Sequence, residues 1–313
     1  MSSYLSRLLI LLLLTTLPSS LSQEAFGQKG KKAQPAAATS SRSVIVVRTE
    51  PKATVWLDEI RRGVTDDEGK LTLSKVSAGR HSLRVRASGF KETTLAIAPA
   101  RRGAIDVKLV RTTDEAELIF QQAEEARESA RDEEARKQSA ELYRRALKAR
   151  PRFAAAHLGL ARVLLDLNDY NTALEEIDRA RADRPVYPEA SAVEGRILRM
   201  AADTNAAIVS FRRAIREARG FQPEAHTGLA LVLEEKGRYD EAVEEFRAAI
   251  SQLSDTEPVL YQLLGAAYEK LQNYREAVLA YEKYLELAPD GTLAPAVRSI
   301  LDQLRSQAAE QNP

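Results

Sequence analysis

The sequence predicts a multidomain protein, in which a small all-β sandwich precedes an all-α solenoid of about five helix pairs and a C-terminal capping helix. Short runs of alternating apolar residues between Val44 and Leu109, separated by Gly, Pro, Asp and Ser turns, predict the strands. A pattern of small and large residues recurs every 34 or 35 residues from Ser139 onward, which is typical of a helical solenoid. A composition of 44% hydrophobic, 29% charged and 6% aromatic residues suits an Ala- and Leu-rich helical protein with a sizeable core.

The N-terminus has the pattern of a cleaved secretory signal over residues 1–22. Arg7 precedes the apolar run 8–17, and the small residues Ser20 and Ser22 follow at the positions that a signal peptidase reads. An uncleaved anchor needs about 20 apolar residues to cross a bilayer, and this run has roughly half that number. The chain contains no cysteine, so disulfides and a lipid-bearing cysteine are excluded. We expect an exported protein, periplasmic or at the cell surface, without a transmembrane span after cleavage.

Residues 23–43 are rich in Gln, Lys, Ala, Ser and Gly and have almost nothing apolar to bury, so they are predicted to be a disordered linker. Residues 44–110 are predicted to form six or seven short strands, which in so short a segment implies a small β-sandwich. Two sets of residues carry a resemblance to known domains. The first set comprises Pro51 to Asp58, Gly63, Ala78 to His81 and Ser88 to Phe90. The second set comprises Thr65 to Leu73. The first set resembles the PEGA domain, and the second resembles the carboxypeptidase regulatory-like domain. Neither resemblance implies a catalytic residue.

The helical repeat is defined by two aligned series of residues. One small residue opens each predicted second helix, and one large residue follows four places later. The small series is Ser139, Ala173, Ala207, Ala242 and Ala277, and the large series is Tyr143, Ile177, Phe211, Phe246 and Tyr281. Small residues where helix axes cross allow close approach, and Ala161, Gly195, Ala230 and Gly265 supply them on the first helices.

Residues 119–291 resemble the tetratricopeptide repeat (TPR) family on these series, with the first unit the weakest match. The predicted solenoid covers 114–291, with repeats at about 120–153, 154–187, 188–222, 223–257 and 258–291. Asp114 and Glu117 are spaced as a reciprocal capping box at its start. Residues 292–313 are predicted to form a capping helix and tail, because a solenoid needs a polar-backed end to cover its last core face.

No motif for catalysis, cofactor binding or metal binding is found, so the protein is predicted to be a non-enzyme without a cofactor. His157 and His226 occupy the same slot of two repeats, which favours packing over acid–base work. His81 has no evident carboxylate or metal partner in the sequence. The acidic run 66–68 before Gly69 is interpreted as a solvated turn rather than a calcium loop.

Charge is divided unevenly along the chain. Residues 44–110 hold 13 Lys and Arg against 8 Asp and Glu, a net charge of +5, whereas residues 111–313 have a net charge of −8. The basic sandwich could attract an anionic cell-envelope polymer, or it could simply contact the acidic solenoid. Nucleic acid is not an expected partner, because no basic face with interleaved aromatic residues is present.

A protein or peptide partner is expected on the concave face lined by first helices. The repeat projects nine residues onto this face: Leu158, Arg162, Leu165, Ala192, Arg196, Arg199, Thr227, Leu231 and Glu234. Arg162, Arg196 and Arg199 are predicted to form one basic strip for an acidic partner, with Leu231 and Glu234 beside it.

The leading functional interpretation is a non-enzymatic protein–protein interaction scaffold of the bacterial cell envelope. The alternative is a cell-wall or surface-carbohydrate binding protein that acts through the sandwich. For that function Trp56, the single tryptophan, could stack on a sugar, although its alternation within a strand favours core packing. An enzyme with an unrecognised site is the third and weakest interpretation.

Overall fold

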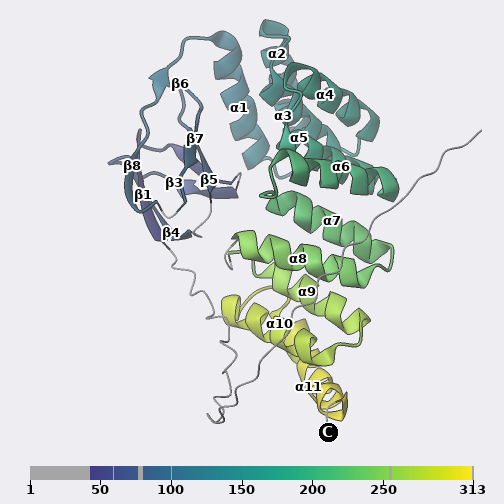
Figure 1. Ribbon diagram of the computed structural model, residues 1–313. Helices are drawn as coiled ribbons and strands as arrows, with labels where there is room; N and C mark the ends of the chain where they lie inside the picture. Colours follow the sequence, from purple (N-terminus) through teal and green to yellow (C-terminus); the bar gives the residue numbers. More distant parts are fainter. Residues whose placement is uncertain (1–42, 59, 77–79, 100, 254–255, 312–313) are drawn as a thin grey trace, which may run out of the picture. The chain divides into compact units, whose positions relative to one another are not determined.

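The computed structural model describes residues 43–58, 60–76, 80–99, 101–253 and 256–311 (Figure 1). The predicted signal peptide and almost all of the predicted linker lie outside these residues, although Ser43 already belongs to the first strand. Everything below concerns one compact unit, Ser40–Pro313.

The N-terminal β region contains nine strands among the described residues. They are β1 (Ser43–Arg48), β2 (Thr54–Leu57), β3 (Ile60–Val64), β4 (Lys70–Val76), β5 (His81–Arg86), β6 (Phe90–Lys91), β7 (Thr93–Ile97), β8 (Gly103–Asp106) and β9 (Val110–Arg111). Their sheets have the orders β4-β1-β8, β3-β2-β5-β7 and β6-β9. All pairings are antiparallel except β1 with β8, where Ile45 faces Gly103.

The two larger sheets of the β region contribute to one apolar core. Val47, Val55, Leu83 and Val85 are fully buried, and Ile45 is nearly so. These residues alternate along their strands with more exposed ones, as the period of two predicted.

The acidic run after Thr65 forms a turn, as predicted. Asp66 Oδ1 accepts hydrogen bonds from the backbone N–H groups of Glu68 (3.0 Å) and Lys70 (2.8 Å). A carboxylate occupied in this way caps its own turn.

The rest of the described chain is helical. Helices α1 (Glu115–Ser129), α2 (Glu133–Ala149), α3 (Ala154–Asp166), α4 (Tyr170–Asp183), α5 (Pro188–Met200), α6 (Thr204–Glu217), α7 (Pro223–Glu235), α8 (Tyr239–Leu253), α9 (Val259–Lys270) and α10 (Tyr274–Leu287) form five consecutive helix pairs, and α11 (Ala294–Gln311) follows them (Figure 1). The predicted solenoid of five pairs with a closing helix is therefore confirmed.

The helix ends follow from local sequence. Asp132, Asp169, Asp203 and Asn273 each cap a second helix by accepting a hydrogen bond from a backbone N–H of its first turn. Pro188 and Pro223 begin first helices, where the missing N–H of proline costs nothing.

The capping box predicted at the start of α1 is only half formed. Asp114 accepts from the backbone N–H of Glu117 at 3.1 Å, as expected. The predicted return bond, from the backbone N–H of Asp114 to the Glu117 side chain, does not form. That N–H donates to Thr112 Oγ1 at 3.2 Å instead. Glu117 instead faces Gln121 and Arg150.

The repeat frame is confirmed by burial. The small series is 0% exposed at all five positions, and the large series is 0–2% exposed. Glycines supply the closest approaches to the large residues: an added Cβ on Gly195 or Gly228 would lie 2.7 or 2.3 Å from the Phe211 ring. Phe211 is therefore held between α5 and α7, and only glycine fits on either side of it.

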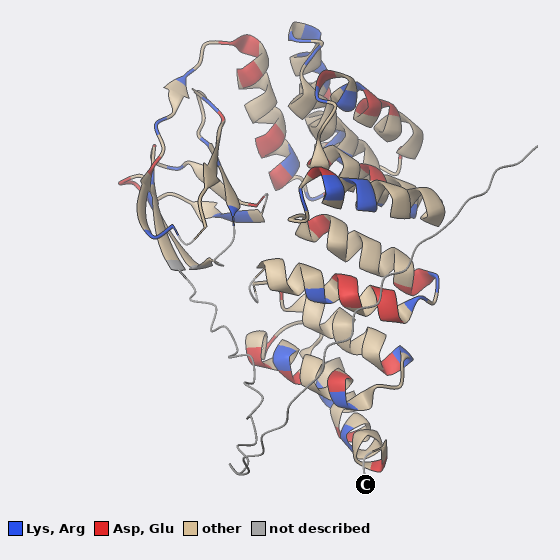
Figure 2. Cartoon of the chain, viewed as in Figure 1, with Lys and Arg blue, Asp and Glu red and all other residues tan. Residues whose placement is uncertain are grey.

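Ion pairs link neighbouring units. Helix α6 carries mostly basic residues on its outer side and α8 mostly acidic ones, seen as blue and red segments in Figure 2. Arg212 lies 3.7 Å from Glu241, and Arg181 Nη2 donates to Glu217 Oε1 at 2.9 Å. These contacts join α6 to α8 and α4 to α6.

Helix α1 departs from the repeat pattern because it contacts the β region. Arg86 of β5 donates to Glu124 of α1 at 2.9 Å, and the backbone N–H of Gly89 donates to Gln121 Oε1 at 3.0 Å. Glu124 is buried and also accepts from Arg127 and from the Tyr143 hydroxyl. Polar residues at these positions of α1 thus replace the apolar residues that another repeat would need.

Candidate partner-binding groove

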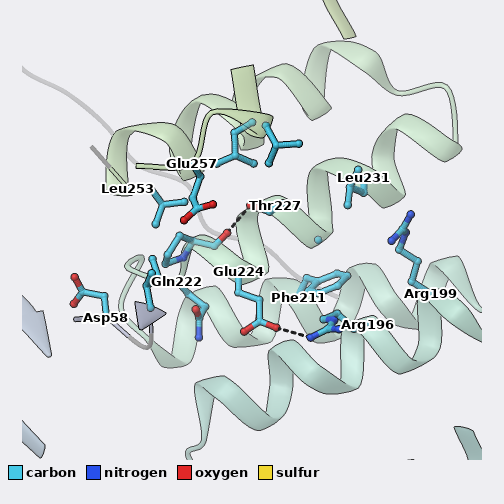
Figure 3. Close-up of a pocket in the computed structure, with 15 residues that line it drawn as sticks. Asp58, Arg196, Arg199, Phe211, Gln222, Glu224, Thr227, Leu231, Leu253 and Glu257 are labelled. Carbon is cyan, nitrogen blue, oxygen red and sulfur yellow. Dashed lines mark hydrogen bonds and ion pairs between the residues drawn. The ribbon is translucent and has the colours of Figure 1, made fainter. Parts of the chain in front are cut away.

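A groove of about 380 Å³ runs across the first helices of the third to fifth repeats (Figure 3). Its floor is apolar: Phe211, Gly228, Leu231, Val259 and Leu260 line it from α6, α7 and α9. Phe211, Gly228 and Leu260 are buried beneath this floor, whereas Leu231 is half-buried and Val259 is 44% exposed, so Leu231 and Val259 form its accessible part. An apolar floor of this kind suits a side chain of a bound chain.

Charged residues surround this floor. Arg196 and Arg199 come from α5, Glu224 from the first turn of α7, and Glu257 from the segment before α9. Arg196 Nη1 donates to Glu224 Oε1 at 3.3 Å (Figure 3). Arg199 donates to Glu235 Oε1 at 2.7 Å.

Asp58, which follows β2, and Ile60, the first residue of β3, add to the lining. Ile60 packs against the apolar core of the C-terminal repeats. Asp58 accepts from the backbone N–H of Ser82 at 2.8 Å and lies 2.6 Å from His81 Nδ1. The expectation that His81 has no carboxylate partner is therefore wrong. The pairing joins residues 23 positions apart in neighbouring strands, which no local pattern reveals.

The predicted concave-face residues do not form one strip. Arg196, Arg199 and Leu231 share the groove, whereas Arg162 lines a separate cavity beside the β region. Arg196 and Arg199 are also already paired with carboxylates of α7. The continuous basic strip expected from the repeat spacing is therefore corrected to two arginines in one groove and a third elsewhere.

Three other residues projected onto the concave face are enclosed. Leu158 is 3% exposed, Leu165 6% and Ala192 0%, because close helix packing covers them. Thr227 is half-buried and donates from its hydroxyl to Pro223 O at 2.9 Å. Thr227 thus lines the groove, Leu158 lines the separate cavity that also contains Arg162, and Leu165 and Ala192 belong to the packed interior.

Glu234 lies at the end of α7, beside the groove but outside its lining. Burial raises its pKa above the ordinary value, and the charge of Glu235 adds to this, whereas Lys270 and Arg199 act in the opposite direction. The net result is a carboxylate whose pKa is raised.

His157 and His226 each join a carboxylate of the same repeat. His157 Nδ1 lies 2.5 Å from Glu176 Oε2, and His226 Nδ1 lies 2.5 Å from Glu245 Oε2, the same 19-residue offset. Both rings are buried, as a packing role predicted, but the sequence reasoning missed the carboxylates. The equal offsets were the signal that could have revealed them.

Trp56 is only 5% exposed, as its strand alternation predicted. The guanidinium of Arg84 lies 4.0 Å from its ring centroid, and that of Arg86 lies 4.7 Å away. A ring covered in this way does not offer a face to a sugar. Trp56 therefore does not support the carbohydrate-binding alternative.

Within the described residues, no group of three or more His, Cys, Asp or Glu side chains is placed to hold a metal ion. The described helices also include none with the length and apolar character needed to cross a membrane.

Two family models, both described as tetratricopeptide repeat, match residues 130–197 and 221–290. The helical part of the chain therefore contains tetratricopeptide repeats. Helix α1, which contacts the β region, lies before the first match.

Several solved structures are similar to the chain. MamA is 26% identical to this chain, the match covers 53% of this chain and 94% of the MamA chain, and the TM-score is 0.46. A thermophilic TPR protein of Thermus thermophilus, TTC0263, is 22% identical, the match covers 60% of this chain and 98% of the TTC0263 chain, and the TM-score is 0.48. The pilF protein of Pseudomonas aeruginosa is 18% identical, and the match covers 62% of this chain and 87% of the pilF chain. Its TM-score of 0.53 shows that the two share the fold. No curated protein matches the chain.

Proposed function

We propose that the protein is a non-enzymatic scaffold that binds an acidic segment of a partner protein in the groove on α5, α7 and α9. The observation that carries this proposal is the combination of an open apolar floor with two arginines at its edge. The side chains of Leu231 and Val259 would accept an apolar residue of the partner, and Arg196 and Arg199 would bind carboxylates flanking it.

The sign of the partner's charge follows from which groups still have unused hydrogen-bonding capacity. A guanidinium has five N–H donors. Among the described residues, Arg196 pairs only with Glu224 and Arg199 only with Glu235. Of the three groove carboxylates, Asp58 is engaged by His81 and Ser82 and Glu224 by Arg196, whereas the Glu257 side chain forms no hydrogen bond or ion pair within the described chain. Arg196 and Arg199 therefore keep unused N–H donors at the edge of the groove, which favours an acidic segment beside them.

Charge reversal tests the groove directly. Arg196→Glu with Arg199→Glu should weaken capture of the partner at least tenfold, because two guanidinium contacts become repulsive. Arg212→Glu with Arg216→Glu on the outer side of α6 is the matched control, since it changes the charge equally outside the groove. Helical content should be the same in both. Equal capture by both double variants would show that the partner binds elsewhere.

Binding should also weaken as salt is added, because exposed charges are screened over about 8–10 Å at physiological ionic strength. Synthetic peptides of opposite charge distinguish an acidic partner segment from a basic one. An Asp- and Leu-containing peptide should bind the full chain, and the double variant Arg196→Glu with Arg199→Glu should weaken that binding. Preferential binding of its Lys-containing counterpart would contradict the proposed charge of the partner.

The location proposed for this scaffold is the bacterial cell envelope. Support comes from the sequence of residues 1–22, with Arg7 before the apolar run and small residues at 20 and 22. N-terminal sequencing of the protein from its native host tests it. A product that begins at residue 23 is expected, and a product that retains Met1 in the membrane fraction would contradict it.

The β region is proposed to be a PEGA-like or carboxypeptidase regulatory-like sandwich that fixes the first repeat through α1. The sequence motifs and the core shared by its two larger sheets support this assignment. In this role the β region supplies position rather than chemistry.

A further inference from the structure

A second cavity, of about 300 Å³, lies between the β region and the first three repeats. Four arginines line it: Arg84 and Arg86 from β5, Arg162 from α3, and Arg184 after α4. Arg162 and Glu189 are half-buried and Arg184 is exposed at the edge of the cavity, so four guanidinium groups gather around one partly open space.

Two of the carboxylates in the cavity, Glu92 and Glu124, accept hydrogen bonds from arginines. Glu92 Oε2 accepts from Arg84 at 3.1 Å and from Arg86 at 2.9 Å. Glu124 accepts from Arg86, Arg127 and Tyr143. These bonds hold the β-region side of the cavity rigid.

The two arginines from the repeats are not engaged in this way. In the described part of the chain, the side chains of Arg162 and Arg184 form no hydrogen bond or ion pair with another residue. The Arg184 guanidinium lies 4.3 Å from the centroid of the Tyr187 ring, so stacking fixes its plane while its N–H edge stays available. Both side chains therefore bring unused donors to one cavity.

One acceptor in the same cavity is also unused. Glu189, in the first turn of α5, has a buried Oε2 atom that accepts no hydrogen bond from the described protein. A buried polar atom without a partner costs free energy, roughly 1–3 kcal/mol, unless a ligand or water satisfies it. The cavity thus offers two cationic donors and one anionic acceptor.

We propose that this cavity binds a small oxyanion that also carries a hydrogen-bond donor. Arg162 and Arg184 would take the anionic oxygens, and Glu189 would accept the O–H or N–H of the ligand. Hydrogen phosphate and a free α-amino acid share this chemistry, and both are small enough for the space. The site is separate from the groove on α5, α7 and α9, so it does not rest on the proposed function.

Calorimetric titration of the full chain tests the site with inorganic phosphate, glycine and acetate. Phosphate or glycine should bind saturably, and which of the two binds identifies the source of the oxyanion. Acetate carries the oxyanion without a donor at neutral pH, so it should bind at least tenfold more weakly. Acetate binding as tight as the better of the other two would overturn the role of Glu189.

Variants assign the binding to the cavity. Arg162→Gln and Arg184→Gln should each weaken the binding about tenfold, the loss expected for one charged hydrogen bond. Arg196→Gln, in the other groove, is the matched control and should bind as the parent does. Neither cavity arginine holds another residue by a hydrogen bond, so the melting temperatures without ligand should stay unchanged. Absence of saturable binding by the parent chain, or parental affinity in both cavity variants, would overturn the proposal.

Discussion

His157 and Glu176 form a buried pair in which the imidazole must donate from both nitrogens. Nδ1 lies 2.5 Å from Glu176 Oε2, and Nε2 lies 3.0 Å from the carbonyl oxygen of Pro151. Both neighbours are acceptors, so this geometry is best satisfied by the charged imidazolium. The ring thereby joins the end of the first repeat to both helices of the second.

This pair predicts that stability falls as pH rises. Burial by itself lowers the pKa of His157, but the hydrogen bonds to Glu176 and Pro151 and the charges of Glu176 and Asp183 raise it by more. A group whose folded pKa is raised contributes full stability below its unfolded value, about 6.5, and loses it as pH rises through the folded pKa. Thermal melts from about pH 6 to pH 9 should show this decline.

His157→Gln is the variant that isolates the effect. It should unfold about 1–3 kcal/mol more easily at pH 6, because a charged hydrogen bond to a buried carboxylate is lost. Its stability should also depend less on pH above 6 than that of the parent chain. Equal pH dependence in the two proteins would show that His157 does not carry the charge.

Gly228→Ala tests the close approach of α7 to Phe211. The new Cβ would lie 2.3 Å from Phe211 Cζ, so the ring or the helix must move. Overpacking of this size costs about 1–3 kcal/mol of the free energy of unfolding, measured by urea denaturation. Phe211→Leu in the same chain should recover part of the loss, whereas additive losses in the double variant would contradict the contact.

Glu124→Gln tests the link between the β region and α1. The substitution removes the charge shared by Arg86 and Arg127, and breaking a buried pair of this kind costs about 3–5 kcal/mol. Trp56 is the single tryptophan and contacts Arg86, so its fluorescence reports this junction. The urea midpoint seen by fluorescence should fall clearly. Glu133→Gln, at an exposed pair with Lys137, is the control and should leave that midpoint nearly unchanged.

Leu231→Asp tests the apolar floor of the groove. A carboxylate among Phe211, Val259 and Leu260 should remove the pocket for an apolar partner residue and repel an acidic segment. Capture of the partner should fall at least tenfold. Leu279→Asp, at a 51% exposed position of α10, is the matched control, and its capture should equal that of the parent chain.

The sequence alone determined the repeat architecture, because the information is local and periodic. Small residues such as Ala242 and large ones such as Phe246 must recur at the spacing of one helix pair, whatever else the chain does. The turn at Asp66 and the helix cap at Asp114 were predictable for the same reason: each bond joins residues a few positions apart.

Only the tertiary structure decided which polar groups meet across distant segments. Asp58 finds His81 across 23 residues, and Arg86 finds Glu124 across 38 residues, between a strand and a helix. The same packing separates Arg162 from Arg196 and Arg199, although the repeat projects all three onto one face. Periodicity fixes which side of a helix a residue occupies, but the partner on that side depends on what packs against it.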